Sequence, residues 1–235
     1  MSKLFIVIPA YNEEANILAV AKDWHEIVVK TGMESRLLII DDGSKDRTYK
    51  MVMELSKQLP QLLPVTKQNS GHGATVLYGY KYALEHQAEY IFQTDSDGQT
   101  LPEEFWQFWE QRDAFAALIG CRHCRKDGIL RIFVSKILRI ILLCVFHLDI
   151  VDANTPFRLM QAKNLRKYIA KIPHEYNLTN ILLTVLFIKY KENVKFIPIS
   201  FLQRQGGVNS INMKRILTIG WQAMRDLIRI KKELQ

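Results

Sequence analysis

Apolar runs alternate with helical patterns along the first half of the chain. Residues 3–8, 37–40 and 90–92 are nearly all apolar, as expected for strands that are buried on both faces. Between Glu13 and Thr31, apolar residues recur every three or four positions, which predicts a helix with one buried face. This alternation predicts an α/β fold with a mixed, mostly parallel sheet and helices on both of its faces.

Weaker patterns extend the alternation. Asp46 is typical of a helix N-cap and predicts a helix that ends near Leu55. By the same reasoning we expect strands over residues 64–66, 116–120 and 198–202, a helix from a glycine-containing turn to about His86, a helix that begins at Pro102, and helices over residues 129–146 and 213–234.

Polar turns follow three of the predicted strands, at residues 9–13, 41–44 and 95–99. In doubly wound sheets, ligands bind in the crevice beyond the carboxyl ends of the strands. One such turn could simply be part of the solvated surface, but three together are hard to explain by packing. The sequence therefore predicts a crevice for a nucleotide-like ligand.

The third turn carries candidate metal ligands. Asp95 and Asp97 directly follow an apolar strand, and Gln99 lies two residues further on. Hard cations such as Mg²⁺ and Mn²⁺ prefer oxygen ligands, and one or two carboxylates together with substrate phosphates are a common arrangement. We therefore interpret this turn as a divalent metal site rather than a solvated acidic turn.

Charge is divided unevenly between the two halves of the chain. Residues 1–121 contain 11 Lys and Arg against 17 Asp and Glu, whereas residues 122–235 contain 21 against 7. The second half is therefore expected to meet an anionic partner such as a membrane surface or a phosphate. Nucleic acid is not expected, because the crevice is acidic and no basic motif with interleaved aromatic residues occurs.

Two predicted helices have basic and apolar faces. In the helix over residues 129–146, a polar stripe of Arg131, Ser135 and Arg139 interrupts an apolar surface that is too short to span a bilayer. The helix over residues 213–234 has a similar pattern. Each could lie in a membrane interface or dock on the protein with its cations in solvent, and the sequence leaves both interpretations open.

The cellular location follows from weaker signals. The first strand begins without a signal-peptide pattern, and three cysteines do not suggest a disulfide framework, so a reducing, cytoplasmic location is expected. With no long apolar span in the sequence, we expect a peripheral protein on the cytoplasmic membrane face, and a membrane-protein partner is a further possibility.

Several strings of this sequence resemble the family-2 glycosyltransferases with the GT-A fold, a Rossmann-like fold for nucleotide-diphosphate sugars. They are residues 8–14, 41–48, 69–74, 95–99, 152–159 and 204–210. The closest subgroup is that of the polyprenyl-phosphate mannose synthases. The resemblance implies a GT-A domain over residues 1–212, with a donor and metal half at 1–121 and an acceptor half at 122–212, followed by an amphipathic helix at 213–235.

The resemblance also implies roles in binding the donor. The residues that would hold its base, ribose and diphosphate are Pro9, Tyr11, Glu13, Asp42, Gly71, Gly73 and Asp95. Asp97 and Gln99 would bind the Mg²⁺ or Mn²⁺ that bridges the two phosphates. A cation there would stabilise the negative charge that develops on the departing nucleoside diphosphate.

On the acceptor side, the resemblance implies that Arg122, Arg131 and Ser135 hold the phosphate of a polyprenyl lipid. Arg204 and Ser210 match a loop that closes over the diphosphate in this subgroup, but Ile211 stands where the subgroup has a lysine. The sequence departs from the subgroup at this position, so either Arg204 carries the leaving-group charge alone or Lys214 also reaches the diphosphate.

Three functions compete. The first is an inverting transfer of sugar to a polyprenyl phosphate, whose ionised oxygen needs no general base. The second is transfer to a glycan hydroxyl, for which Asp152 is the candidate base. The third is a nucleotide-binding module without catalysis, which only the high pI of about 9.3 supports.

Overall fold

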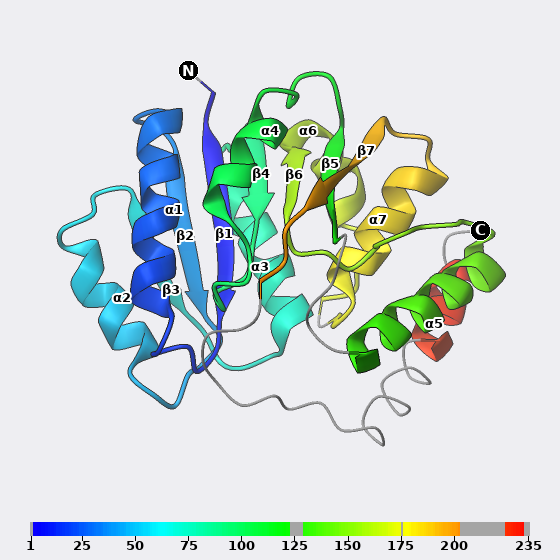
Figure 1. Ribbon diagram of the computed structural model, residues 1–235, viewed down its shortest axis with the longest axis horizontal. Helices are drawn as coiled ribbons and strands as arrows, with labels where there is room; N and C mark the ends of the chain where they lie inside the picture. Colours follow the sequence, from blue (N-terminus) through cyan, green and yellow to red (C-terminus); the bar gives the residue numbers. More distant parts are fainter. Residues whose placement is uncertain (1, 123–128, 175, 203–223, 233–235) are drawn as a thin grey trace.

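A computed structural model describes residues 2–122, 129–174, 176–202 and 224–232, with the backbone alone for residues 129–133. These residues form one seven-stranded sheet with the strand order β3-β2-β1-β4-β6-β5-β7 (Figure 1). The strands are β1 (Leu4–Ala10), β2 (Arg36–Asp41), β3 (Leu62–Thr66), β4 (Tyr90–Gln93), β5 (Ala117–Arg122), β6 (Arg158–Gln161) and β7 (Val194–Ile199).

Only β6 runs antiparallel to its neighbours, so the sheet is mixed and mostly parallel, as predicted. Because β4 and β5 are both antiparallel to β6, they are parallel to each other. The carboxyl ends of β1, β2, β4 and β5 therefore meet at the same edge of the sheet, and the polar turns of the predicted crevice are found there.

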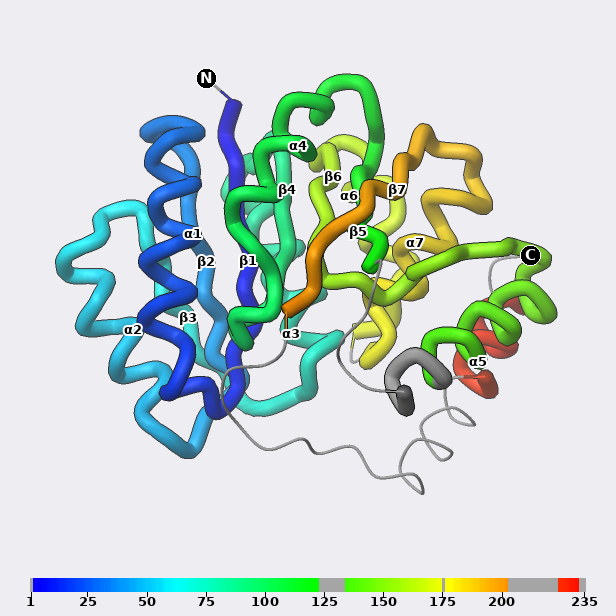
Figure 2. Tube along the Cα trace, viewed as in Figure 1, coloured from blue at the N-terminus to red at the C-terminus, as the bar shows by residue number. Residues whose placement is uncertain are grey.

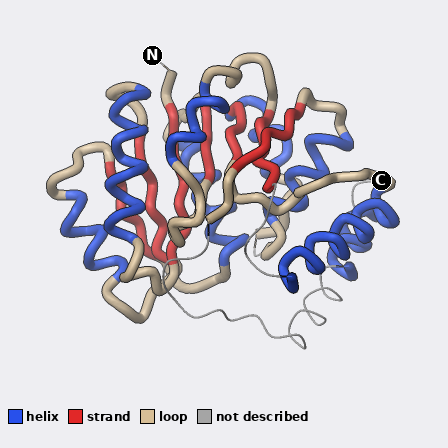
Figure 3. The backbone as a smooth tube through the Cα atoms, in the orientation of Figure 1, coloured by secondary structure: helices blue, strands red, loops and turns tan. Residues whose placement is uncertain are grey.

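Helices cover both faces of the sheet, which Figure 3 shows as a row of strands between two layers of helices. The helices are α1 (Ile17–Thr31), α2 (Thr48–Ser56), α3 (His72–Glu85), α4 (Phe105–Trp109, after a short 3-10 turn at Pro102–Glu104), α5 (Ile129–Phe146), α6 (Ala162–Ile169) and α7 (Thr179–Lys189). Burial of the apolar stripes of these helices against the sheet is the main source of stability.

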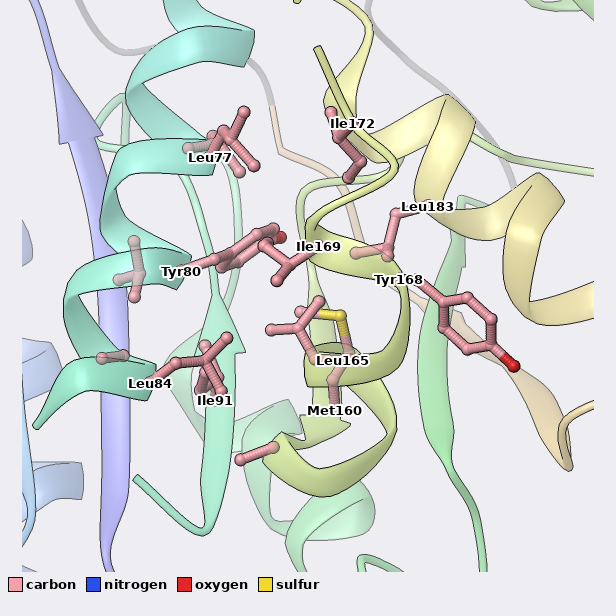
Figure 4. Packing of buried hydrophobic residues seen from close by; sticks show 14 of the residues in the cluster. Leu77, Tyr80, Leu84, Ile91, Met160, Leu165, Tyr168, Ile169, Ile172 and Leu183 are labelled. Carbon is pink, nitrogen blue, oxygen red and sulfur yellow. The ribbon is translucent and has the colours of Figure 1, made fainter. Parts of the chain in front are cut away.

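The two faces have separate cores. On one face α1, α2 and α4 pack against the strands around Trp24 and Phe92, whose rings lie 5.2 Å apart. On the other face α3, α6 and α7 form the second core, in which Tyr80, Leu165 and Leu183 are packed together (Figure 4). The predicted helix over residues 129–146 is observed at those bounds as α5.

α5 lies beside the C-terminal helical residues 224–232, at one end of the molecule (Figure 2). Leu142 and Val145 of α5, Val185 of α7 and Leu227 share a third, smaller apolar cluster. Leu227 and Ile230 are fully buried, so this part of the C-terminal helix docks on the protein, while Ile228 remains 41% exposed.

One predicted strand was misplaced, and one region had no predicted elements. The strand expected at residues 198–202 is β7 at Val194–Ile199, where it pairs with β5. Because β7 is an edge strand with exposed Lys195 and Pro198, its apolar pattern is broken. No elements were assigned to the stretch that contains β6, α6 and α7. Helix α7 is buried almost all round and so lacks the usual helical period.

Candidate active site

The predicted crevice exists as a cleft of about 370 Å³ at the carboxyl ends of β1, β2 and β4. Parallel strands bring their following turns together here, although the turns are far apart in the sequence. Seven of the predicted residues line the cleft, together with five others that include His72; the lining residues that the sequence analysis named are Pro9, Tyr11, Glu13, Asp42, Gly71, Asp95 and Asp97.

Asp42 ties the glycine-containing turn to the end of β2. One carboxylate oxygen accepts hydrogen bonds from Lys67 Nζ and from the Ser70 amide, and the other accepts from the Gly71 amide at 2.9 Å. Burial opposes ionisation, but the bonds from Lys67 and Ser70 outweigh it and lower the pKa of Asp42. Asp42 therefore builds the wall of the cleft as a buried, ionised carboxylate.

The turn after β1 is tied to the turn after β2. The Asn12 amide donates to Ser44 Oγ at 2.9 Å, and the Glu13 amide donates to Thr48 Oγ1 at 2.8 Å. Asn12 has a positive φ of 54°, which turns the chain sharply beside Tyr11. Tyr11 lines the cleft and is 43% exposed, so its ring is available to a flat ligand such as a nucleotide base.

The turn after β4 presents two carboxylates with different partners. Asp95 Oδ1 lies 3.0 Å from His72 Nε2 and accepts a hydrogen bond from Gln93 Nε2 at 3.3 Å. Asp97 Oδ1 accepts from the Gln99 amide at 3.2 Å, across Gly98, which has a φ of 70°. These hydrogen bonds hold both carboxyl groups of the turn at the cleft.

His72 also lines the cleft; from the sequence, donor contact and a solvated histidine were equally good interpretations of it. Its side chain is 54% exposed, and Nε2 faces Asp95 Oδ1. Burial lowers the pKa of His72, but the carboxylates of Asp95, Asp97 and Asp42 outweigh this effect and raise it. The sequence feature that places His72 at the cleft is its position directly after Gly71, as the first residue of α3.

Gln99 lies beneath the cleft rather than along its lining. It is 2% exposed, and its side-chain amide donates to the Leu202 carbonyl at 2.7 Å. The Leu202 amide in turn donates to the Gln99 carbonyl at 2.8 Å. The segment that follows β7 is thereby fastened to the acidic turn, and metal ligation by Gln99 remains a prediction.

Gly73 has a packing role that the sequence analysis did not foresee. A Cβ at this position would lie 2.2 Å from the Asn177 carbonyl oxygen, so only glycine fits between α3 and the segment before α7. Gly73 is not among the residues that line the cleft. Contact between Gly73 and a donor, which the resemblance implied, stays a prediction.

Arg122 and Asp152 form a buried ion pair at the same edge of the sheet. Arg122 Nε and Nη2 each lie 2.8 Å from a carboxylate oxygen of Asp152, and the two side chains are only 10% and 9% exposed. The guanidinium also lies 5.2 Å from the centre of the Phe201 ring. Both oxygens of Asp152 are engaged, so this carboxylate orients Arg122.

The other acceptor-side predictions fall on α5 or beyond it. Ser135 is partly buried on α5, whereas the side chain of Arg131 lies outside the described residues. The side chain of Arg139 forms an ion pair with Asp149, with Nη2 2.7 Å from Oδ2. Arg204 and Ser210 also lie outside the described residues.

One side of α5 packs against α7, and its other side is open and carries both apolar and basic side chains, the latter including Lys136 and Arg139. Ile140 is 60% exposed and Leu143 is 48% exposed, and Val134 lies on the same helix at 38%. Among the described helices, none has both the length and the hydropathy that crossing a bilayer requires.

A mixed sheet of this order, with a cleft of acidic turns at its carboxyl edge, defines a GT-A fold. The same fold is found in glucosyl-3-phosphoglycerate synthase from Mycobacterium tuberculosis, whose structure with Mn²⁺, uridine diphosphate and phosphoglyceric acid superimposes with a TM-score of 0.72. That alignment covers 98% of this chain and 78% of the other, at 13% sequence identity.

The sequence profile of Glycosyl transferase family 2 matches residues 5–170. This chain belongs to glycosyltransferase family 2 and is a glycosyltransferase. It is similar to polyprenol monophosphomannose synthase of Mycolicibacterium smegmatis, with 26% identity over 91% of this chain and 83% of that protein. A UDP-N-acetylglucosamine–dolichyl-phosphate N-acetylglucosaminyltransferase of Methanococcus voltae is 32% identical over 43% of each chain.

Proposed function

We propose that this glycosyltransferase moves a sugar from a nucleotide-diphosphate sugar to a polyprenyl phosphate with inversion at the anomeric carbon. One observation carries the proposal: the acidic cleft and the buried Arg122–Asp152 pair lie at the same edge of the sheet. The first provides polar groups and an aromatic ring for a nucleotide-sugar, and the second provides a cation for an anionic acceptor. The two relatives above, a polyprenol monophosphomannose synthase and a dolichyl-phosphate N-acetylglucosaminyltransferase, support the same kind of acceptor.

Donor binding would use the cleft residues. Tyr11 offers its ring to the base, Glu13 and Asp42 shape the wall around the base and ribose, and Asp97 faces the diphosphate. The backbone at Gly71, where α3 begins, is available to anionic groups, because a helix N-terminus carries partial positive charge.

The carboxylate chemistry of the turn fits a divalent cation. In the described part of the chain, no three His, Cys, Asp or Glu side chains are grouped as a complete metal site. A Mg²⁺ or Mn²⁺ ion held by Asp97, with Gln99 as the second predicted ligand, would therefore complete its coordination with donor phosphates and water. When bound, such an ion would stabilise the charge on the leaving nucleoside diphosphate.

Acceptor binding would use Arg122, with Arg131 and Ser135 as further predicted contacts. A guanidinium makes paired, charge-assisted hydrogen bonds to phosphate oxygens. The phosphate is already ionised near neutral pH, so its oxygen can attack the anomeric carbon without a general base. Because Arg122 engages both oxygens of Asp152, the geometry favours this acceptor over a glycan hydroxyl that would need Asp152 as its base.

The open side of α5 would lie in the membrane interface, where the lipid acceptor is found. Ile140 and Leu143 would enter the boundary between headgroups and acyl chains, while cations of the basic second half face anionic lipids. The enzyme would then be peripheral on the cytoplasmic membrane face, with a membrane-protein partner as an additional anchor.

An acceptor comparison tests the proposal. The protein is incubated with a panel of radiolabelled UDP- and GDP-sugars and Mn²⁺, together with either polyprenyl phosphate or the matching polyprenol in detergent micelles. We expect label to enter the organic phase with the phosphate and not with the polyprenol. Label that appears only in water-soluble glycan would contradict the proposal and support a hydroxyl acceptor.

A further inference from the structure

A fully buried arginine lies between the donor and acceptor sides of the cleft. Arg158 is the first residue of β6, which pairs with β4 on one side and β5 on the other. Its backbone is in register with Gln93 of β4 and Ile119 of β5, and the residue is only 1% exposed. Burial lowers the pKa of Arg158, as expected for a cation placed in a protein core.

The guanidinium of Arg158 is bound by carbonyl and hydroxyl oxygens. Nε and Nη2 donate to the Thr155 carbonyl at 2.9 and 2.6 Å, and Nη2 also donates to the Ala153 carbonyl at 3.1 Å. Nη1 donates to the Asn180 carbonyl at 3.0 Å and to Thr184 Oγ1 at 3.2 Å. Within the described residues, no carboxylate is among its hydrogen-bond partners.

These bonds fix the segment that carries Asp152. Ala153 and Thr155 lie one and three residues after Asp152, and their carbonyls accept hydrogen bonds from Arg158. Thr184 Oγ1 makes a second link from α7 to the Ala153 carbonyl at 3.1 Å. Asp152 is therefore held in place to accept hydrogen bonds from Nε and Nη2 of Arg122.

The guanidinium of Arg158 is also connected to the donor side of the cleft, through its hydrogen bond to Asn180. Asn180 Nδ2 donates to Gln93 Oε1 at 3.0 Å, and Gln93 Nε2 donates to Asp95 Oδ1 at 3.3 Å. The Tyr80 hydroxyl lies 3.2 Å from both Gln93 and Asn180 and completes the network from α3. Figure 4 shows Tyr80 extending from α3 toward α6 in this core.

Burying a guanidinium without a paired carboxylate is costly, and an apolar side chain would fill the same space at lower cost. A role in stability alone therefore does not account for Arg158. We propose that Arg158 is a positioning residue for sugar transfer. It fixes the Asp152–Arg122 pair and Asp95 relative to each other, so that the bound acceptor and donor are correctly oriented for reaction. This inference rests on the proposed function, because it takes Arg122 as an acceptor contact.

The test replaces Arg158 with lysine, which keeps the charge but has a single nitrogen that cannot span all four partners. Misplacement of reacting groups by about 1 Å can cost on the order of 100-fold in rate. We expect R158K to lower kcat at least tenfold and to leave the KM for the donor within threefold of the wild-type value. The concentration of active sites is determined from nucleoside diphosphate binding in Mn²⁺. R36K is the matched control. Arg36 also donates hydrogen bonds to two carbonyls, but it is the first residue of β2 and so lies at the end of that strand away from the cleft.

T184V provides a second variant that keeps Arg158 itself, in case R158K does not fold. It removes one acceptor of Arg158 and one link to Ala153, and we expect at least a threefold loss of kcat. A residue with a purely structural role would lower the melting temperature and leave the kcat of the folded sites unchanged. Wild-type kcat and acceptor KM in folded R158K or T184V would overturn the inference.

Hydrogen exchange separates this inference from the proposed function. We expect faster exchange at the amides of residues 152–157 in R158K and T184V, and no change there in R36K. If the wild-type protein transfers no sugar to lipid phosphate, the proposed function fails, but the exchange result still decides whether Arg158 holds this segment. Unchanged exchange in both variants would contradict the positioning role.

Discussion

At the scale of single residues, the site depends on carboxylates that are close in space but have different partners. Asp42 is locked by Lys67 and two backbone amides, Asp95 lies against His72, and Asp152 is fully engaged by Arg122. Asp97 accepts a hydrogen bond from the Gln99 amide and faces the cleft. We therefore expect these carboxylates to respond differently to the same Asp→Asn change.

Replacing Asp97 with asparagine should remove activity and leave the fold intact. Under the proposed function Asp97 is a metal ligand, and its loss would remove several kcal/mol of leaving-group stabilisation, so we expect kcat to fall by about 100-fold or more. The initial rate of sugar transfer and the melting temperature are measured together. D113N is the matched control, because Asp113 is 72% exposed and lies away from the cleft; comparable rates for the two variants would refute the role of Asp97.

Asp152 should matter for stability as well as for activity. D152N leaves the buried guanidinium of Arg122 without its paired charge, and breaking such a pair costs on the order of 3 kcal/mol. We expect a lower free energy of unfolding in urea and a higher KM for the lipid phosphate. A variant that is as stable as the wild-type protein would show that the pair does not hold Arg122.

Asp42 should make the fold sensitive to acid. Its folded-state pKa is lowered, so the ionised form contributes stability that is present above the unfolded pKa of about 4. That contribution is lost as the pH falls through the lower folded pKa. Urea unfolding of the wild type and D42N at pH 7 and at pH 3 should show a stability difference that shrinks at low pH; a constant difference would contradict this assignment.

At the scale of elements, the cleft depends on how α3 starts. A Cβ at Gly73 would meet the Asn177 backbone at 2.2 Å, whereas a Cβ at Gly79 would meet the side-chain ends of Val7 and Ile40. Side-chain ends can move aside more cheaply than backbone can. We therefore expect G73A to lower the free energy of unfolding by about 1–3 kcal/mol, and by more than G79A does. Equal losses in denaturant unfolding would show that the segment before α7 yields easily.

The exposed side of α5 is the element expected to meet lipid. Introducing glutamate at Ile140 or Leu143 should weaken sedimentation with vesicles of anionic lipid several-fold and leave the melting temperature unchanged, because both side chains are already open to solvent. M33E is the matched control, since Met33 is 81% exposed and lies between α1 and β2. If I140E and L143E bind vesicles like M33E, α5 is not the membrane contact.

Elements were predictable where the apolar pattern was regular. The strands β1, β2 and β4 and the helices α1 and α5 follow clear periods, and their bounds were close to those observed. β7 was misplaced because an edge strand is only partly apolar, and α7 gave no signal because nearly every residue of it is buried. Local periodicity cannot report contacts that other segments impose.

The cleft itself could be predicted because its turns follow strands directly, and parallel strands bring such turns together. The partners within the cleft could not. The link from Gln99 to Leu202 spans 103 residues, and the Tyr80–Asn180 contact spans 100, so neither leaves a local pattern in the sequence. Arg158 was recognisable only as part of a family string, and its burial depends on the neighbouring strands.

At the scale of the whole molecule, the sheet joins an acidic half with the cleft to a basic half with α5. Residues 1–121 have a net charge of −6 and residues 122–235 have +14. The acidic half suits a metal-bound nucleotide, and the basic half suits a lipid phosphate at a membrane surface. The antiparallel strand β6 lies between β4 and β5, so the sites of the two halves are separated by a single strand.

The most direct test of the central claim is the initial rate of label transfer from nucleotide-sugar to polyprenyl phosphate, measured in Mn²⁺, after chelation of divalent cations, and after Mn²⁺ is restored. The account predicts label in the organic phase with Mn²⁺, almost none after chelation, and full recovery when the cation returns. Transfer that continues unchanged in the presence of the chelator would contradict it.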